Sequence, residues 1–214
     1  MVFLYDLHVH TSEVSFCGCI AGDEMAELYS EAGYAGIVIT DHYFEGFFDS
    51  LQGTWQDKLQ AYLQGYRAAH RRGQELGLDV LLGLELRFKG TSEDFLIYGV
   101  DEEFLLEYPR LDHYGLHNFS RLAKKHNLLV FQAHPFRPGL KVAEPQHLDG
   151  IEVFNGNPRH DSRNDLALAY ARQHGLLEIT CSDAHRHEDV AVAAVELPLR
   201  TRTSAELVAQ LKSK

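Results

Sequence analysis

The sequence predicts an α/β protein whose strands close into a barrel. Its 214 residues are enough for one domain with a large core, and few for two. Apolar residues make up 45% of the chain and charged residues 24%, which is the balance of a globular protein. Seven short apolar runs alternate with helical patterns, and no Ser- or Pro-rich linker divides them. We therefore expect one domain over residues 1–214, with a parallel sheet covered by helices.

The seven predicted strands share short apolar sequences bounded by polar or turn-forming residues. They span residues 2–7, 35–40, 80–84, 95–100, 128–133, 150–154 and 176–181. Helical periodicity, with plausible N-caps, predicts helices over residues 23–32, 55–76, 114–126, 162–174 and 204–212. The polar segment 87–94 is expected to be a loop. Seven strands alternating with helices predict a closed barrel rather than an open sheet.

The charge balance restricts the partners. The chain carries 31 acidic and 20 basic residues, a formal net charge of −11, which does not fit the capture of a long nucleic acid. A small anionic substrate remains compatible, because metal ions among carboxylates reverse the local field. Three cysteines (Cys17, Cys19 and Cys181) are too few for a disulfide framework, and no apolar run reaches membrane-spanning length. We expect a cytoplasmic protein with no membrane partner.

Side chains of metal-binding types follow six of the predicted strands. They are His8 and His10, Asp41 and His42, Glu85, His134, Asn155, and Asp183 with His185. Each signal has an ordinary alternative: paired histidines can be solvated, and an Asp-x-His can be a polar turn. In α/β barrels, however, functional groups gather at the carboxyl ends of the strands. The conjunction of six such ends predicts a multinuclear metal site there.

Two carboxylates and one pair of cysteines leave narrower alternatives. Glu85 either bridges two ions or forms a salt bridge at the barrel mouth. Asp41 either orients a metal-binding imidazole or caps the following helix. A structural zinc on Cys17 and Cys19 would need about four ligands, and no second matching pair exists.

These residues lie in motifs that resemble the PHP family, the polymerase and histidinol phosphatase domain. The segments are 6–11 (DLHVHT), 39–42 (ITDH), 83–85 (GLE), 133–135 (AHP) and 182–185 (SDAH). The resemblance implies a distorted (β/α)7 barrel with two or three divalent transition-metal ions at the carboxyl ends of its strands. The ions are manganese, iron or zinc, and the activity is hydrolysis of phosphoesters.

The resemblance also implies a distribution of ligands. It assigns His8, His10, Glu85 and Asp183 to a first ion, Glu85 with His134 to a second, and His42 with His185 to a third. The commoner family pattern has Asp or His a few residues after the second histidine. This chain offers Glu13 as the strong oxygen ligand there, and we expect it to complete the third site. Asp101 is a further candidate, unless it only begins a helix.

The expected function is a metal-dependent phosphatase acting on a small phosphomonoester, by attack of a metal-bound hydroxide. Asn155, Arg159 and Arg163 are the candidates to bind the substrate, the arginines as bidentate phosphate clamps or as solvated helix-start residues. A 3′–5′ exonuclease or nucleotide phosphodiesterase is one alternative. A non-catalytic, metal-stabilised module of a larger assembly is the other.

Overall fold

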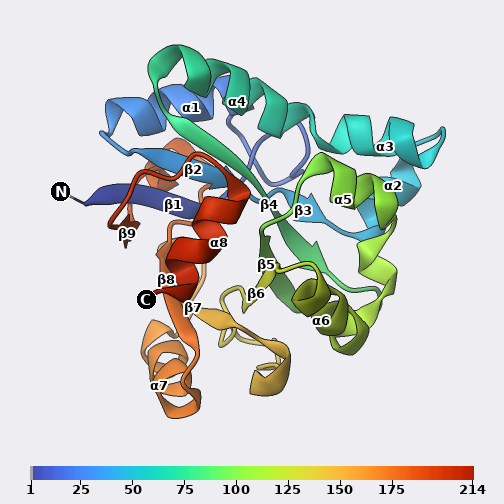
Figure 1. Ribbon diagram of the computed structural model, residues 1–214, viewed down its shortest axis with the longest axis vertical. Helices are drawn as coiled ribbons and strands as arrows, with labels where there is room; N and C mark the ends of the chain where they lie inside the picture. Colours follow the sequence, from blue (N-terminus) through green and yellow to red (C-terminus); the bar gives the residue numbers. More distant parts are fainter. Residues whose placement is uncertain (1) are drawn as a thin grey trace.

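One sheet curls into a nearly closed barrel in the computed structural model, which describes residues 2–214 (Figure 1). Its strands are β1 (Phe3–Val9), β2 (Gly36–Ile39), β3 (His42–Tyr43), β4 (Asp79–Arg87), β5 (Asp94–Tyr98), β6 (Leu129–Gln132), β7 (Gly150–Asn155), β8 (Leu177–Cys181) and β9 (Val195–Leu197). Hydrogen-bonded neighbours follow the order β8-β7-β6-β5-β4-β2-β1-β9, and β3 pairs with β4. The barrel closes at a bridge between Val9 and Ala184. The predicted α/β barrel is confirmed.

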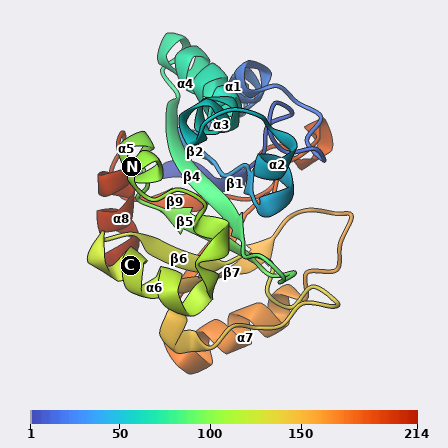
Figure 2. The same ribbon diagram turned by 90° about the vertical axis from the view of Figure 1, so that its right-hand side faces the viewer.

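Helices surround this sheet (Figures 1 and 2). They are α1 (Gly22–Glu31), α2 (Glu45–Ser50), α3 (Trp55–Tyr62), α4 (Gln64–Leu76), α5 (Glu102–Glu107), α6 (Gly115–Lys125), α7 (Asn164–His174) and α8 (Ser204–Lys212). The helix predicted over 55–76 is divided at Leu63, and its first half begins with a capping box between Thr54 and Asp57. The six-residue helices α2 and α5 are too short for their periodicity to predict them. Among the described residues, none of these helices is long and apolar enough to cross a membrane.

All seven predicted strands are present, but the expectation of a wholly parallel sheet is wrong. Strand β5 runs antiparallel to both β4 and β6. Six residues, 88–93, connect β4 to β5, and a parallel crossover needs about a dozen. The predicted loop 87–94 is therefore a hairpin in which Arg87 pairs with Asp94. As a result, the first residue of β5 lies at the rim where the parallel strands end.

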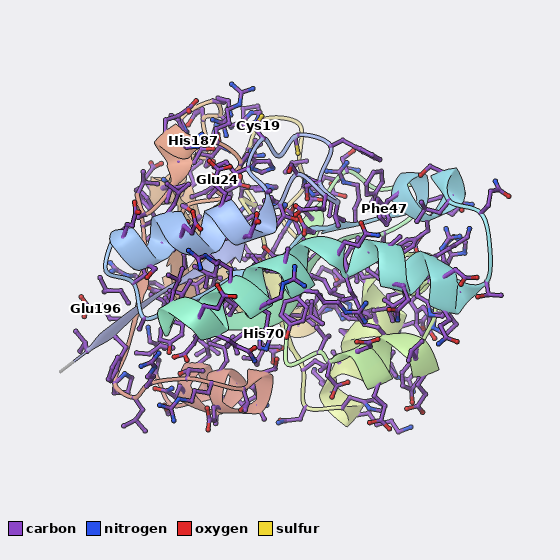
Figure 3. All side chains as sticks on the ribbon, turned by 90° about the horizontal axis from the view of Figure 1, so that it is seen from above. Cys19, Glu24, Phe47, His70, His187 and Glu196 are labelled. Atoms are coloured by element: carbon purple, nitrogen blue, oxygen red, sulfur yellow. The ribbon has the colours of Figure 1, made fainter. Side chains whose placement is uncertain are left out.

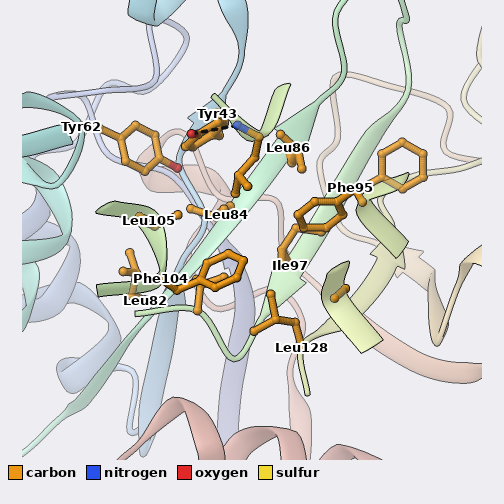
Figure 4. Close-up of a cluster of buried hydrophobic side chains, with 14 of the residues drawn as sticks. Tyr43, Tyr62, Leu82, Leu84, Leu86, Phe95, Ile97, Phe104, Leu105 and Leu128 are labelled. Atoms are coloured by element: carbon orange, nitrogen blue, oxygen red, sulfur yellow. Dashed lines mark hydrogen bonds between the residues drawn. The ribbon is translucent and has the colours of Figure 1, made fainter. Parts of the chain in front are cut away.

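The strands separate an inner from an outer core. On β4, Leu81 belongs to an inner apolar cluster with Leu96, Phe131 and Ile179, and three residues of α8 pack against this cluster: Leu207, Val208 and Leu211. The alternating residues Leu82, Leu84 and Leu86 face outward into a second cluster beneath α3, α5 and α6 (Figure 4). Helix α8 packs close to the turn that ends β5, where Val208 lies against Gly99. The inner core thus closes the end of the barrel opposite the rim that carries the polar side chains.

A bulge in β1 positions the first histidine. Asp6 pairs with Ile37 and Val9 with Ile39, so three steps along β1 match two along β2. Asp6 and Val9 consequently both face the outer side, where the Asp6 carboxylate accepts a hydrogen bond from Tyr29 and Val9 packs with the α1 cluster. A bulge re-aims the side chains beside it. Here it turns His8 toward the carboxylates inside the barrel mouth.

Candidate metal centre

Seven predicted ligands meet at the barrel mouth. They are His8, His10, His42, Glu85, His134, Asp183 and His185. The carboxylate of Glu85 lies at their centre: its Oε1 is 3.3 Å from His8 Nε2 and 3.1 Å from His134 Nε2, and its Oε2 is 3.5 Å from His10 Nε2. Asp183 Oδ1 lies 3.4 Å from His8 Nε2 and 3.5 Å from His10 Nε2. Two carboxylates thus face the same two imidazole nitrogens.

Two buried nitrogens of this cluster lack hydrogen-bond partners within the described chain. His8 Nε2 and His10 Nε2 are buried and make no hydrogen bond among residues 2–214, whereas Glu85 Oε2 lies 2.5 Å from His42 Nδ1. Buried polar atoms are normally paired, so two unpaired nitrogens at one place need an explanation. Ligand atoms at about 2.1 Å from a tetrahedral ion are separated by roughly 3.4 Å, close to the 3.3–3.5 Å found here. The residues therefore fit a divalent transition metal.

Hydrogen bonds on the far side of three of the rings, those of His8, His10 and His185, present Nε2 to the centre. His8 Nδ1 lies 2.9 Å from Glu152 Oε1, and His185 Nδ1 lies 2.9 Å from the Asp183 carbonyl. His10 Nδ1 lies 3.0 Å from Ser15 Oγ, whose own proton goes to Asp41. Each Nδ1 therefore donates, and the lone pair of Nε2 stays free for a metal. Asp41 orients His10 through Ser15; the alternative of a helix cap is excluded, because α2 begins after Phe44.

Glu152 is an orienting residue that the sequence patterns missed. It lies fully buried in β7, and its carboxylate accepts hydrogen bonds from His8 Nδ1, the His134 amide at 2.7 Å and Asn155 Nδ2 at 2.9 Å. The available signal was a carboxylate within an apolar strand, which is costly unless partners surround it. Its position at the centre of the predicted strand 150–154 hid that signal.

The antiparallel β5 corrects the expectation for Asp101. Asp101 is exposed, and its side chain caps α5 by accepting from the Phe104 amide at 2.8 Å. It follows the end of β5, which lies at the opposite rim. Asp94, the first residue of β5, is brought to the site instead, with Oδ2 4.0 Å from His134 Nε2 and near Glu85. The strand direction, which the apolar pattern does not report, decides between them.

The structure also corrects Glu13. Its two carboxylate oxygens accept from the Gly22 amide at 3.0 and 3.1 Å, at the start of α1, and it joins none of the described ligand clusters. A helix start offers free amides that attract a carboxylate. The side chain of this loop that reaches His42 is Cys17, with Sγ 3.2 Å from His42 Nε2.

The three predicted substrate residues differ in their positions. Arg159 lines a pocket of about 370 Å³ above the ligands, where Asp189 holds its guanidinium through two hydrogen bonds. Arg163 is exposed beside Asp161 and lies outside the pocket. Asn155 lies behind the site, donating to Glu152 and to Asp183, so it positions ligands rather than facing the pocket.

Arg137 also lines this pocket, although the sequence did not identify it as a substrate residue. Its Nη2 donates to Asp183 Oδ2 at 3.0 Å, and its buried Nε has no partner among the described residues. Arg87 and Arg186 line the same pocket. An arginine in the short loop after His134 gives no spacing signal, because its direction depends on the loop path.

In the metal-free site, protonated histidines offset the negative charge of the buried carboxylates. Burial would lower the pKa of His8, but Asp183, Glu152 and Glu85 raise it well above its ordinary 6.5. Burial would raise the pKa of Glu85, but His42 and His8 hold it well below its usual range. Burial, with His185 and His42 nearby, keeps the pKa of His10 well below 6.5. A cation binding here would replace those protons.

Two of the ligands adopt strained backbone conformations. His134 has φ of 28° and Asp183 has φ of 55°, in the region that favours glycine. Such conformations cost about 1–3 kcal/mol and persist where the surroundings impose them. Glu152 holds the amide of His134, and Arg137 and Asn155 hold the side chain of Asp183. This loss of stability accompanies an arrangement in which His134 points at Glu85 and Asp183 points at His8 and His10.

Comparisons with known proteins agree with this geometry. A family model described as PHP-associated matches residues 161–214, which include α7, β8, β9 and α8. Among solved structures, the fold resembles a two-domain protein from Bacteroides vulgatus ATCC 8482 that contains a predicted PHP-like metal-dependent phosphoesterase. The TM-score is 0.68 at 18% identity, over 99% of this chain and 62% of that one.

Two further structures share the fold. PsfC from Pseudomonas syringae PB-5123 has a TM-score of 0.68 at 17% identity, over 97% of this chain and 88% of that one. An amidohydrolase from Chromobacterium violaceum, solved with bound sulfate and no metal, has a TM-score of 0.56 at 16% identity, over 97% of this chain and 96% of that one.

No curated protein matches the sequence. The chain spans less than two thirds of the Bacteroides protein. The match of residues 161–214 to the PHP-associated model agrees with the resemblance to the PHP family that the strand-end motifs predict, and the solved structures share the barrel fold.

Proposed function

We propose that this protein hydrolyses a small phosphomonoester at a centre of two or three divalent ions held by the histidine and carboxylate cluster. The observation that carries the proposal is one pocket of about 370 Å³ that joins this cluster to four arginines: Arg87, Arg137, Arg159 and Arg186. A net charge of −11 makes such a concentration of cationic groups unusual for this chain. Metal ligands beneath and guanidinium groups above suit a substrate with a phosphoryl group.

The residues divide into those that hold ions and those that hold substrate. Glu85, His8, His10 and Asp183 would hold a first ion, and Glu85 with His134 and Asp94 a second. Such ions supply a nucleophile from water near neutral pH and neutralise phosphoryl oxygens. Arg137 lines the pocket and holds Asp183 through Nη2, so its guanidinium group is placed to bind a phosphoryl oxygen next to the ions.

The size of the site favours a small substrate. Beside the ligands, a second pocket of about 200 Å³ is lined by Phe16 and Phe44 together with Cys17 and His42. It gives room for the organic part of one phosphomonoester next to the phosphoryl position. An acidic chain repels a polyanion beyond the few phosphates that the ions and arginines neutralise. This argues against the exonuclease alternative.

The site also argues against a non-catalytic module. A module that uses ions only for stability needs no open pocket, whereas here ligands and arginines line the same accessible space. The three cysteines are free thiols. Free thiols fit a reducing compartment, and we place the proposed activity in the cytoplasm.

Substrate preference tests the proposal. We expect the manganese-, zinc- or iron-loaded protein to hydrolyse a small phosphomonoester with a higher kcat/KM than a labelled single-stranded oligonucleotide. The rate on the small substrate should change little with salt, because contact is confined to about one phosphate. Binding along a strand would instead lose roughly 0.7 log units of affinity per log of salt for each contact. A higher kcat/KM on the oligonucleotide with a steep salt dependence would contradict the proposal.

Arg137→Ala should raise KM for the phosphomonoester and lower kcat/KM by about 10- to 100-fold. Hydrogen bonds to charged groups contribute about 1.5–3 kcal/mol, which corresponds to this range. Arg163→Ala is the matched control, since that side chain is exposed outside the pocket, and it should leave both parameters unchanged. Metal content measured on both variants separates substrate binding from loss of Asp183 positioning. Unchanged KM in Arg137→Ala would remove this arginine from the substrate site.

A further inference from the structure

The loop between β1 and α1 places a thiol against two histidines of the centre. Cys17 Sγ lies 3.2 Å from His42 Nε2, and it is also within hydrogen-bonding reach of the His185 side chain. His185 uses Nδ1 for the Asp183 carbonyl, so Nε2 is the nitrogen left for another partner. His42 directs its Nδ1 to Glu85 and its Nε2 away from it. Three donors from three separate segments therefore meet on the side of the centre away from His134.

A second observation at the same place is independent of the thiol. His10 is fully buried, its Nε2 has no hydrogen-bond partner within residues 2–214, and its ring packs 4.1 Å from His185 and 4.5 Å from His42. One donor atom of each of these three histidines lies within 4.8 Å of the others. An ordinary thiol–imidazole hydrogen bond would explain the contact of Cys17 with His42. It would not explain why three imidazole rings converge at the same place.

The loop holds Cys17 in this position from both sides. Before it, Ser15 Oγ donates to Asp41 at 2.7 Å; after it, the Cys19 amide donates to the His185 carbonyl at 2.8 Å. The Gly18 amide donates to the Ser15 carbonyl at 2.7 Å, and a Cβ on Gly18 would lie 2.9 Å from the Thr11 carbonyl oxygen. The tight turn therefore requires glycine next to the cysteine. Such a fixed loop presents the thiol without the ordering cost of a mobile one.

We propose that Cys17 is a thiolate ligand of an ion held with His42 and His185, in the position where sequence patterns favoured the oxygen ligand Glu13. The inference rests on the metal centre of the proposed function. A thiolate is a soft ligand that favours zinc or iron(II), whereas manganese prefers oxygen ligands. The subsite formed by Cys17, His42 and His185 therefore prefers zinc or iron(II) to manganese, while the carboxylate-rich subsites around Glu85 accept manganese as well.

Cobalt substitution tests the ligation directly. Cobalt(II) replaces zinc in tetrahedral sites, and a cobalt–thiolate bond gives a charge-transfer absorption in the near ultraviolet. We expect this absorption in the cobalt-loaded protein, its loss in Cys17→Ser, and its retention in Cys19→Ser. Cys19 is the matched control because it is exposed two residues away, on the outer surface near His187 and Glu24, and it lines neither pocket at the centre (Figure 3). Absence of the band from the unmodified protein, or its persistence in Cys17→Ser, would overturn the proposal.

Metal stoichiometry and thiol protection give two further measurements. The unmodified protein should bind one more zinc ion per chain than manganese ions. Cys17→Ser should lose that one zinc ion and keep the others. Cys17→Asp should allow manganese to bind at this subsite. A thiol reagent should modify Cys17 and Cys19 in the metal-free protein, where Cys181 is buried, and only Cys19 after zinc is added. Equal zinc content in Cys17→Ser would contradict the assignment. These readouts need no turnover, so an inactive protein that still shows the cobalt–thiolate band overturns the proposed function and not the ligation.

Discussion

Glu85→Gln is expected to lower kcat/KM for the phosphomonoester by about three orders of magnitude, and to reduce the ion content from at least two per chain to at most one. An amide coordinates more weakly than a carboxylate and adds no charge, so it cannot bridge two ions. A bound ion contributes several kcal/mol of transition-state stabilisation, which corresponds to about a thousandfold in rate. Glu85 contacts four imidazoles, so no other side chain in the cluster can take over its position.

Elemental analysis of protein prepared without chelators, together with steady-state kinetics at saturating metal, measures this effect. Glu103→Gln is the control, because Glu103 is exposed in the first turn of α5 at the opposite rim and should keep both metal and activity. Circular dichroism of the metal-free variants checks that the fold survives. Full hydrolysis by Glu85→Gln would show that this carboxylate is a structural partner of the histidines and not a bridge.

Removal of the ions is expected to lower the melting temperature, by a larger amount as the pH rises. A ligand at a thousandfold excess over its Kd stabilises a fold by about 4 kcal/mol. For a protein of this size that is roughly 10 °C for each ion. The metal-free site relies instead on protons: the carboxylates around His8 and His42 raise the pKa of both rings well above 6.5, although burial opposes this.

The sign of the pH dependence follows from those raised pKa values. Stability from a histidine whose folded pKa is raised is fully present below its unfolded value of 6.5, and it is lost as the pH rises through the folded value. Bound ions replace these protons, so the loaded protein keeps its stability. Calorimetry with and without chelator between about pH 6 and pH 9 should show a widening gap, and Glu85→Gln should show a smaller one. A melting temperature that chelator leaves unchanged at every pH would contradict a metal centre of this kind.

Much of the architecture could be predicted from local sequence patterns. The runs of apolar residues locate all seven long strands, and Thr203 with Glu206 form the capping box that begins α8 at its predicted first residue, Ser204. These features depend on periodicity and capping, which neighbouring residues determine. The ligands at the carboxyl ends of the parallel strands could also be predicted from the sequence. The shared direction of those strands brings His8, His42, His134 and Asp183 to one rim.

By itself, the sequence therefore determined the α/β class, the barrel and the ligands at the ends of its parallel strands. Tertiary structure alone decided what depends on direction and on loop path. Six residues between β4 and β5 reverse β5, which brings Asp94 to the site and takes Asp101 away from it. In the first loop, the free amide at the start of α1 binds Glu13, and Cys17 is the side chain that reaches His42. Local periodicity reports which residues are buried, but the side of the barrel to which a loop side chain turns depends on contacts with residues far along the chain.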